Sequence, residues 1–293
     1  MLSTLHNRPC PRPLNTLTLA TCGLLSYGCV LPTSSPSISG SRLCPFVGTE
    51  MVLTVAAESS LSTPAPEVIQ AAADVAASRL AELAISPAAV FLGESGAIVV
   101  QLPAEVDINQ VRSLLGNQGE LTFRPQKVGD QYQELLPLLA ERQAIAATDA
   151  AALEAVDVAI LTLFDAPAIH GGDVQDADAT LTFGERWEVA VDFTETGAQQ
   201  FADLTREVAG TGRAVGIFMD NELLSAPTVD VSYGETGITG GRAVISGTFS
   251  QAEAEAIALQ IQSGAFPAPI EIASLQQMTT IDENCEAESG DRL

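Results

Sequence analysis

Few residues in this chain have the type and spacing that catalysis requires. His170 lies beside Gly171-Gly172 and Asp173, an arrangement that could suggest a catalytic loop. The only other histidine, His6, is near the start of the chain, so the folded part offers no second imidazole for a histidine-based metal site. We therefore interpret His170 as a loop residue without a chemical role.

The acidic residues that follow could instead bind calcium. Asp173, Asp176 and Asp178 provide carboxylates, but their spacing lacks the D-x-D-x-D-G ligand pattern of a calcium loop. A solvated acidic loop is the favoured interpretation. With 37 Asp and Glu residues in the chain, no pair of carboxylates stands out as a general acid and base.

Other motifs are incomplete as well. The glycine-rich stretch 234–241 has no Lys-Ser/Thr of a phosphate loop, and 93–97 lacks the final glycine of a nucleophile elbow. No two of the cysteines have C-x-x-C spacing; they are Cys10, Cys22, Cys29, Cys44 and Cys285. The sequence thus predicts no catalytic, cofactor-binding or metal residue, no cofactor, and a protein that is not an enzyme.

Composition restricts the partners. The 293 residues include 13 Lys and Arg against 37 Asp and Glu, a formal net charge of −24. Such a surface repels phosphate backbones, so we expect no nucleic-acid partner, and it disfavours anionic membranes for the folded part. The hydrophobic content of 46% is typical of a globular protein.

Residues 1–47 differ from the rest because they contain arginines but no acid. An apolar run, 14–31, predicts an export signal, although its polar residues make it marginal for a membrane span. Ser26-Tyr27-Gly28-Cys29 resembles a lipoprotein cleavage site, with Ser26 where leucine is usual. A transit peptide and an overlong, misassigned start are the alternatives. Residues 32–47 are typical of a flexible tether.

The next stretch, 48–126, alternates strands and helices. The order is strand, helix, strand, strand, helix, strand, which predicts a ferredoxin-like base. Arg79 falls on the apolar face of the first helix, and we expect its charge to reach outward to solvent. The expected elements are 50–57, 66–84, 89–92, 97–102, 108–115 (with Asp107 as N-cap) and 120–124.

The rest of the chain predicts a helical insertion and a second α+β subdomain. Two helices are expected over 127–166, with Pro137 in a first turn or breaking a helix. Asp220-Asn221 suits a hairpin turn, and Ser250 with Glu253 forms a capping box ahead of a helix that ends near Gly264. The other expected segments are a loop at 167–178, strands at 187–193, 214–219, 223–231, 243–245 and 270–275, a helix at 195–208, and an acidic tail at 276–293.

Three stretches resemble one known family. They read VDFTETGAQQFADLTREVAG, MDNELLSAP and ISGTFSQAEAEAIALQIQSGAFPAP, in this order. They are similar to the first large periplasmic domain of SecD, a membrane subunit that assists export by the Sec translocon. The likeness is strong over 186–272 and weaker over 48–185. It implies an α+β fold with a ferredoxin-like base followed by a head, here 167–275 with the return strand.

The sequence also departs from that family. Only Gly48 remains of the glycine pair before the first strand, the Gly-Pro-x-x-Gly segment after the last strand is missing, and no long apolar run follows residue 50. We therefore expect a stand-alone form without the membrane bundle and its proton pathway.

The resemblance implies a function, and a second hypothesis stays open. The first is an accessory factor of Sec export in the cell envelope, on the periplasmic or thylakoid-lumenal side. It would bind unfolded exported polypeptide or Sec translocon subunits, and would contact the membrane only through its N-terminal segment. The second is a scaffold module that uses the same fold for an unrelated envelope partner. Expected hinges lie near Pro125 and Gly129 and at 264–269.

Overall fold

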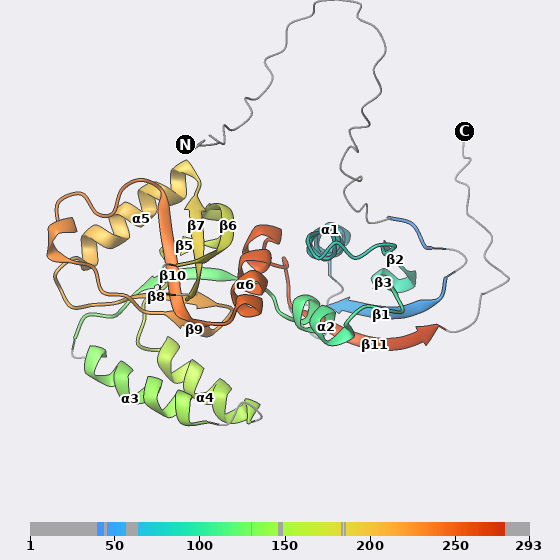
Figure 1. Ribbon diagram of the computed structural model, residues 1–293, viewed down its shortest axis with the longest axis horizontal. Helices are drawn as coiled ribbons and strands as arrows, with labels where there is room; N and C mark the ends of the chain where they lie inside the picture. Colours follow the sequence, from blue (N-terminus) through green and yellow to red (C-terminus); the bar gives the residue numbers. More distant parts are fainter. Residues whose placement is uncertain are drawn as a thin grey trace, which may run out of the picture. The chain divides into compact units, whose positions relative to one another are not determined.

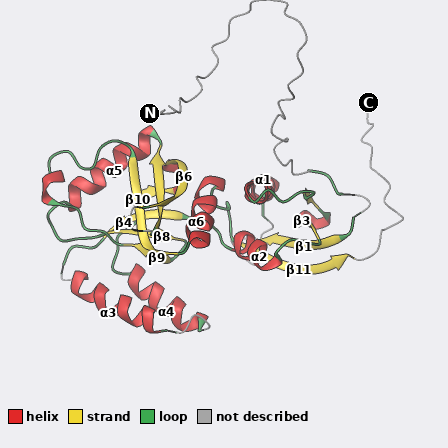
Figure 2. Cartoon of the chain, viewed as in Figure 1, coloured by secondary structure: helices red, strands yellow, loops and turns green. Residues whose placement is uncertain are grey.

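The computed structural model describes residues 40–278, apart from 44–45, 57–63, 130, 146–148, 183 and 185. Helices and strands are mixed along this range, which confirms the predicted α+β class (Figure 2). The predicted export signal, the five cysteines and the tail from residue 279 onward lie outside the described residues.

One group of elements, which we call the base, has its own four-stranded antiparallel sheet in the order β11-β1-β3-β2. Met51 pairs with Val100 and Leu53 with Ile98, so their side chains share the face against which both helices pack. The elements of the base are β1 (Gly48–Val55), α1 (Pro66–Glu82), β2 (Ala89–Leu92), β3 (Ile98–Pro103), α2 (Ile108–Gly116) and β11 (Ile270–Met278).

The last strand of this sheet is not the one that the sequence predicted. Residues 120–124 were expected to complete the base, but β4 (Leu121–Pro125) pairs with β5 (Ile169–His170) and β8 (Val215–Met219) instead. The place beside β1 belongs to β11, which pairs along the whole of β1 and extends to Met278, so 276–278 are strand and not tail. The reason is burial: Leu121 and Phe123 are fully buried in the core of the second group of elements.

That second group, the head, contains a three-stranded sheet in the order β10-β7-β6 and a four-stranded sheet in the order β5-β4-β8-β9 (Figure 1). Residues of both sheets share one hydrophobic core with α5 and α6. The strands are β5 (Ile169–His170), β6 (Val174–Leu181), β7 (Trp187–Phe193), β8 (Val215–Met219), β9 (Glu222–Ser225) and β10 (Arg242–Phe249); the helices are α5 (Glu195–Val208) and α6 (Gln251–Ser263).

Residues 167–178, expected to form a loop, are largely strand. β5 pairs with β4, and β6 pairs with β7 from Val174 onward. Ala177 is buried in the core, whereas Asp176 and Asp178 are exposed on the other side. The alternation of small apolar and acidic residues therefore marks a half-buried strand, which the acidic composition concealed.

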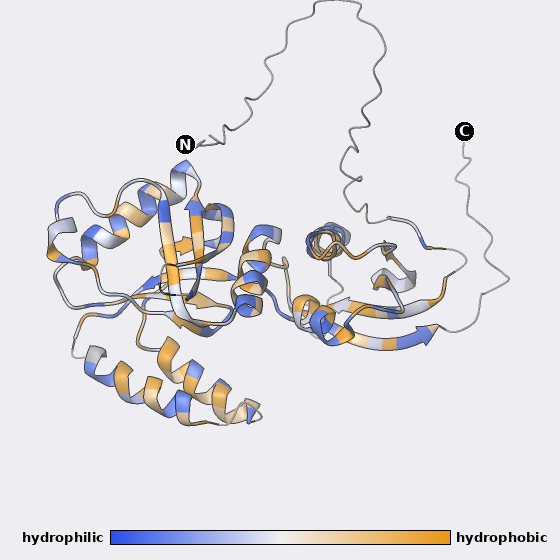
Figure 3. Ribbon diagram, viewed as in Figure 1, coloured by the Kyte–Doolittle hydropathy of each residue, from blue (hydrophilic) through white to orange (hydrophobic). Residues whose placement is uncertain are grey.

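Two helices, α3 (Gln131–Ala144) and α4 (Ala150–Leu161), lie side by side, as expected for 127–166 (Figure 1). Apolar residues of both helices, orange in Figure 3, surround Phe164 and Phe218, whose rings meet edge to face at 5.1 Å. Pro137 lies inside α3 and does not break it. The carbonyl that it leaves without an intrahelical donor, that of Gln133, belongs to an exposed residue.

Arg142 joins this helical pair to the head sheet. Its Nε lies 2.6 Å from Oδ1 of Asp157 on α4, and its Nη2 donates to Glu222 on β9. The hydrogen bond to Asp157, followed by the bond to Glu222, raises the pKa of Arg142. One side chain thus connects α3, α4 and β9.

The predicted capping box at α6 is present. The Ser250 amide donates to the Glu253 carboxylate at 2.8 Å, and the Glu253 amide donates to Ser250 Oγ at 3.3 Å. These bonds hold the pKa of Glu253 below its ordinary value. Ser250→Ala should lower the free energy of unfolding by about 1 kcal/mol, measured by denaturant titration. The exposed Thr248→Ala, outside the cap, is the control; an equal effect of both would contradict a capping role.

Arg79 does not reach solvent as predicted. Its side chain is fully buried, and its guanidinium donates to four backbone carbonyls, those of Leu114, Asn117, Gln118 and Gly264. The prediction was wrong because outward extension assumes free solvent above the helix, and here α2 and two connecting segments cover it.

Candidate functional site

The head contains an apolar cavity of about 250 Å³ at the edge of a sheet. Only three of its lining side chains are polar, namely Thr205, Thr228 and Arg242. The floor consists of core residues such as Phe201 and Ile217. The remaining lining residues are Val215, Pro227, Val229, Ile238, Ala243 and Val244.

Strand β10 forms one side of this cavity, and its edge away from β7 is unpaired, with β9 close by. It pairs with β7 alone among the strands that the structure describes. Its residues alternate, with Ile245 buried in the core and Val244 still 47% exposed. An unpaired strand edge presents backbone donors and acceptors to an incoming extended chain. Beside it, the cavity offers room for an apolar side chain.

Two of the three polar side chains at the cavity, Thr205 and Arg242, already have partners. Thr205 Oγ1 donates to the Phe201 carbonyl at 2.7 Å and accepts from the Ile238 amide at 2.8 Å. At the rim, Arg242 Nε lies 3.0 Å from Asp192 Oδ1. The cavity therefore favours apolar ligand groups over charged ones.

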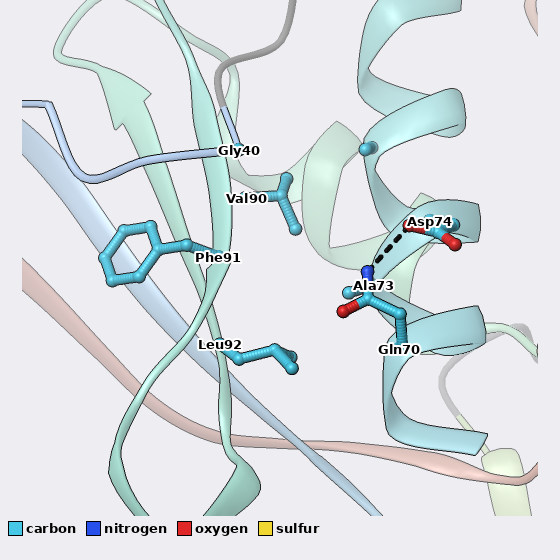
Figure 4. A pocket seen from close by; sticks show the side chains of 8 residues that line it. Gly40, Gln70, Ala73, Asp74, Val90, Phe91 and Leu92 are labelled. Atoms are coloured by element: carbon cyan, nitrogen blue, oxygen red, sulfur yellow. Dashed lines mark hydrogen bonds between the residues drawn. The ribbon is translucent and has the colours of Figure 1, made fainter. Parts of the chain in front are cut away.

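A second depression, of about 170 Å³, lies on the base between α1 and β2. In Figure 4, Gln70 and Asp74 come from successive turns of α1 and are bonded to each other, Nε2 to Oδ1 at 2.9 Å. Val90, Phe91 and Leu92 of β2 line the other side, and in Figure 4 the side chains of Val90 and Leu92 point toward α1 whereas the Phe91 ring points away. Because its two polar side chains satisfy each other, this depression has no group directed at a ligand.

His170, Asp173 and Asp176, which were considered as catalytic or calcium-binding residues, make hydrogen bonds within the fold. The His170 amide donates to Asp173 Oδ2 at 3.0 Å, and the Asp173 carbonyl accepts from the amide and the hydroxyl of Thr194. His170 Nδ1 lies 3.8 Å from Glu120 at the surface. Asp176 Oδ1 accepts from Gln262 on α6 at 3.1 Å. Over residues 40–278, outside the gaps noted above, no group of three or more His, Cys, Asp or Glu side chains could hold a metal ion.

The expected hinge at Pro125 and Gly129 does not lie at a connection between base and head. Pro125 ends β4 and pairs with Val215 inside the head sheet. The chain leaves the base earlier, between α2 and β4, at residues 117–120. The return at 264–269, between α6 and β11, agrees with the other expected hinge position.

Comparison with known proteins assigns this fold. The sequence model of the SecDF P1 head subdomain matches residues 149–268. The match includes α4, whereas the sequence pattern alone suggested an insertion over 127–166. A solved structure described as a membrane component SecDF that enhances protein export has a TM-score of 0.61 and 27% identity, covering 78% of this chain and 100% of that chain.

Curated relatives agree with this assignment. The chain is 37% identical over 213 residues to protein translocase subunit SecD of Synechocystis, covering 66% of this chain and 45% of the relative. It is 28% identical over 228 residues to SecDF of Thermus thermophilus, covering 76% and 30% respectively. These matches define an α+β domain of the kind that SecDF proteins carry as P1. Over this region the chain is similar to the periplasmic domain of SecD.

The chain spans less than half the length of these two relatives. Within the described part of the chain, no helix has both the length and the hydropathy needed to cross a membrane. The cavity at β10 was not apparent from the sequence, although β10 itself was predicted in part. The walls of this cavity come from α5, from β8, from β10 and from the segment that follows β9. No local sequence pattern links these four parts of the chain.

Proposed function

We propose that this protein is a non-enzymatic accessory factor of Sec-dependent export that binds translocating polypeptide on the extracytoplasmic side of the membrane. The family assignment supports a role in export, because the relatives are named translocase subunits and one solved relative is described as enhancing protein export. The observation that carries the binding role is the unpaired edge of β10 beside an apolar cavity.

A polypeptide in transit is unfolded, so it exposes unpaired backbone groups and apolar side chains. Addition to the edge of β10 would satisfy backbone groups without requiring a particular sequence. The cavity, at about 250 Å³, is smaller than a pocket for a drug-sized ligand, which holds roughly 300–1,000 Å³. It therefore suits one or two side chains of a chain that must later be released.

The partner and the compartment belong to the same proposal. A Sec translocon subunit would bring the head close to the emerging chain, and the N-terminal segment would attach the protein to the membrane. Co-purification with the translocon channel would support this arrangement. A stable complex with an unrelated envelope protein, together with normal export in a deletion strain, would support the scaffold function instead.

Val244→Asp should weaken the binding of an unfolded chain at least about tenfold, which corresponds to about 1.4 kcal/mol. The substitution places a charge at the mouth of an apolar cavity, where burial beneath a bound chain is costly. Fluorescence anisotropy with a reduced, alkylated and labelled polypeptide measures this affinity.

Leu181→Asp is the matched control. Leu181 is 56% exposed and ends β6, the opposite edge strand of the same sheet. The control should bind as the unmodified chain does. Weaker binding by the control and unchanged binding by Val244→Asp would place the site on the other edge, and no binding by the unmodified chain would refute the proposed function.

A further inference from the structure

Two connections join the base to the head, and they are hydrogen-bonded to each other. The outgoing connection is 117–120 and the returning connection is 264–269. The Phe266 amide donates to the Gln118 carbonyl at 2.9 Å, and Gln118 Nε2 lies 3.4 Å from the Phe266 carbonyl. Segments separated by about half of the sequence therefore meet at one point.

Arg79 of α1 lies at this meeting point. Its Nη1 donates to the carbonyls of Leu114 and Asn117 at 2.6 and 2.7 Å. Its Nη2 donates to Gln118 in the outgoing connection at 2.7 Å and to Gly264 in the returning connection at 2.9 Å. Hydrogen bonds from a charged donor are stronger than neutral ones, and the planar guanidinium fixes their directions.

The surroundings confine the guanidinium. Its Cζ lies 4.2 Å from the centre of the Phe266 ring, a cation–π distance. At Gly119, whose φ is +78°, a Cβ would lie 2.4 Å from Nη2, so a larger residue would collide with the guanidinium. Burial lowers the pKa of Arg79 to about 10, which still leaves the group charged at neutral pH.

We propose that Arg79 is a conformational latch, a single buried side chain that fixes the two connections to each other and so sets the orientation of the head on the base. Moving the head would require the guanidinium to release carbonyls of one connection or both. Because the guanidinium is buried, water cannot replace the carbonyls that it releases, and each lost hydrogen bond is costly. The head would therefore move in a cooperative step and not gradually. This inference does not depend on what the head binds.

Hydrogen exchange of the full chain tests the latch. In Arg79→Met, which keeps the length of the side chain but removes its charge and donors, the Phe266 amide should exchange at least about tenfold faster. Amides of β7 in the head and of β1 in the base should change by less than about twofold. Equal acceleration throughout the base would show that Arg79 merely stabilises the fold, and would overturn the proposal.

Arg112→Met is the matched control, because Arg112 is an exposed arginine on α2 of the same base. It removes the same charge and should leave the exchange of Phe266 unchanged; acceleration equal to that of Arg79→Met would also refute the latch. If Arg79→Met does not fold, Arg79→Lys keeps the charge but not the planar fork and should give intermediate exchange.

A distance measurement gives an independent readout. Spin labels at Glu82→Cys on α1 and Gln199→Cys on α5, with the five native cysteines replaced by serine, report the distance between base and head. The distance distribution should be narrow with Arg79 and at least about twofold broader with methionine. An unchanged width in a folded Arg79→Met variant would overturn the proposal.

Discussion

Gly237→Ala is expected to destabilise the head by about 3–5 kcal/mol, one of the largest effects of any single methyl group in this protein. Gly237 has φ of +69°, which a residue with a side chain adopts only at a cost. A Cβ there would lie only 1.8 Å from the carbonyl oxygen of Ala202, within the backbone of α5. The loop can approach so closely only because the residue is glycine.

The neighbouring bonds prevent the loop from moving aside. The Gly237 amide donates to Tyr233 at 2.8 Å, and the next amide, that of Ile238, donates to Thr205 on α5 at 2.8 Å. Unfolding of the head can be followed through Trp187, the single tryptophan of the chain, which lies on β7.

Gly212→Ala separates the two causes of the destabilisation expected for Gly237→Ala, which are backbone strain at a positive φ and the collision with Ala202. Gly212 has φ of +78°, but a Cβ at this position would have no atom within 4 Å. Its substitution should cost only the backbone strain, about 1–2 kcal/mol. Equal losses for the two variants would mean that the contact with Ala202 is relieved by a small shift, and would refute the explanation by close packing.

Phe123→Ala is also expected to lower the free energy of unfolding by about 3–5 kcal/mol. Phe123 is fully buried on β4, where it pairs with Ile169 and Ile217. Its ring lies edge-on to Phe193 at 5.5 Å and to Phe201 at 6.1 Å. Truncation would leave a cavity where two sheets and α5 meet, and would remove two favourable aromatic contacts.

Denaturant unfolding followed at Trp187 measures this loss. Phe91→Ala is a suitable control, because Phe91 is only partly buried on β2, an edge strand of the base. The control should leave the Trp187 transition of the head nearly unchanged. If Phe123→Ala shifted this transition no more than the control does, β4 could not be a central strand of the head core.

Much of the local structure was predictable because its causes are local. The helix 195–208 was predicted with the bounds that α5 has, since its apolar residues recur at helical spacing. The Ser250–Glu253 box marks the start of α6, and the turn at Asp220-Asn221 separates β8 from β9. The capping box joins residues three positions apart, and the hairpin turn depends on two adjacent residues. Both can therefore be predicted without knowing which distant segments pack nearby.

The cavity at β10 and the meeting point at Arg79 were not predictable in this way. The cavity combines α5, β8 and β10, and the contacts of Arg79 join residues as much as 185 positions apart. A period of 3.6 places Arg79 on the apolar face of α1, but it does not say what covers that face. The absence of complete catalytic motifs was visible in the sequence, whereas the unpaired edge of β10 was not.

By itself, the sequence determined the α+β class, the SecD resemblance and the type of almost every element, because these depend on composition, spacing and short-range hydrogen bonds. Only the tertiary structure decided that β11 and not β4 completes the base, that β10 has an unpaired edge, and that Arg79 is buried between two connections. Strand partners and the burial of a charge depend on which distant surfaces meet, and no local stretch of sequence contains that information.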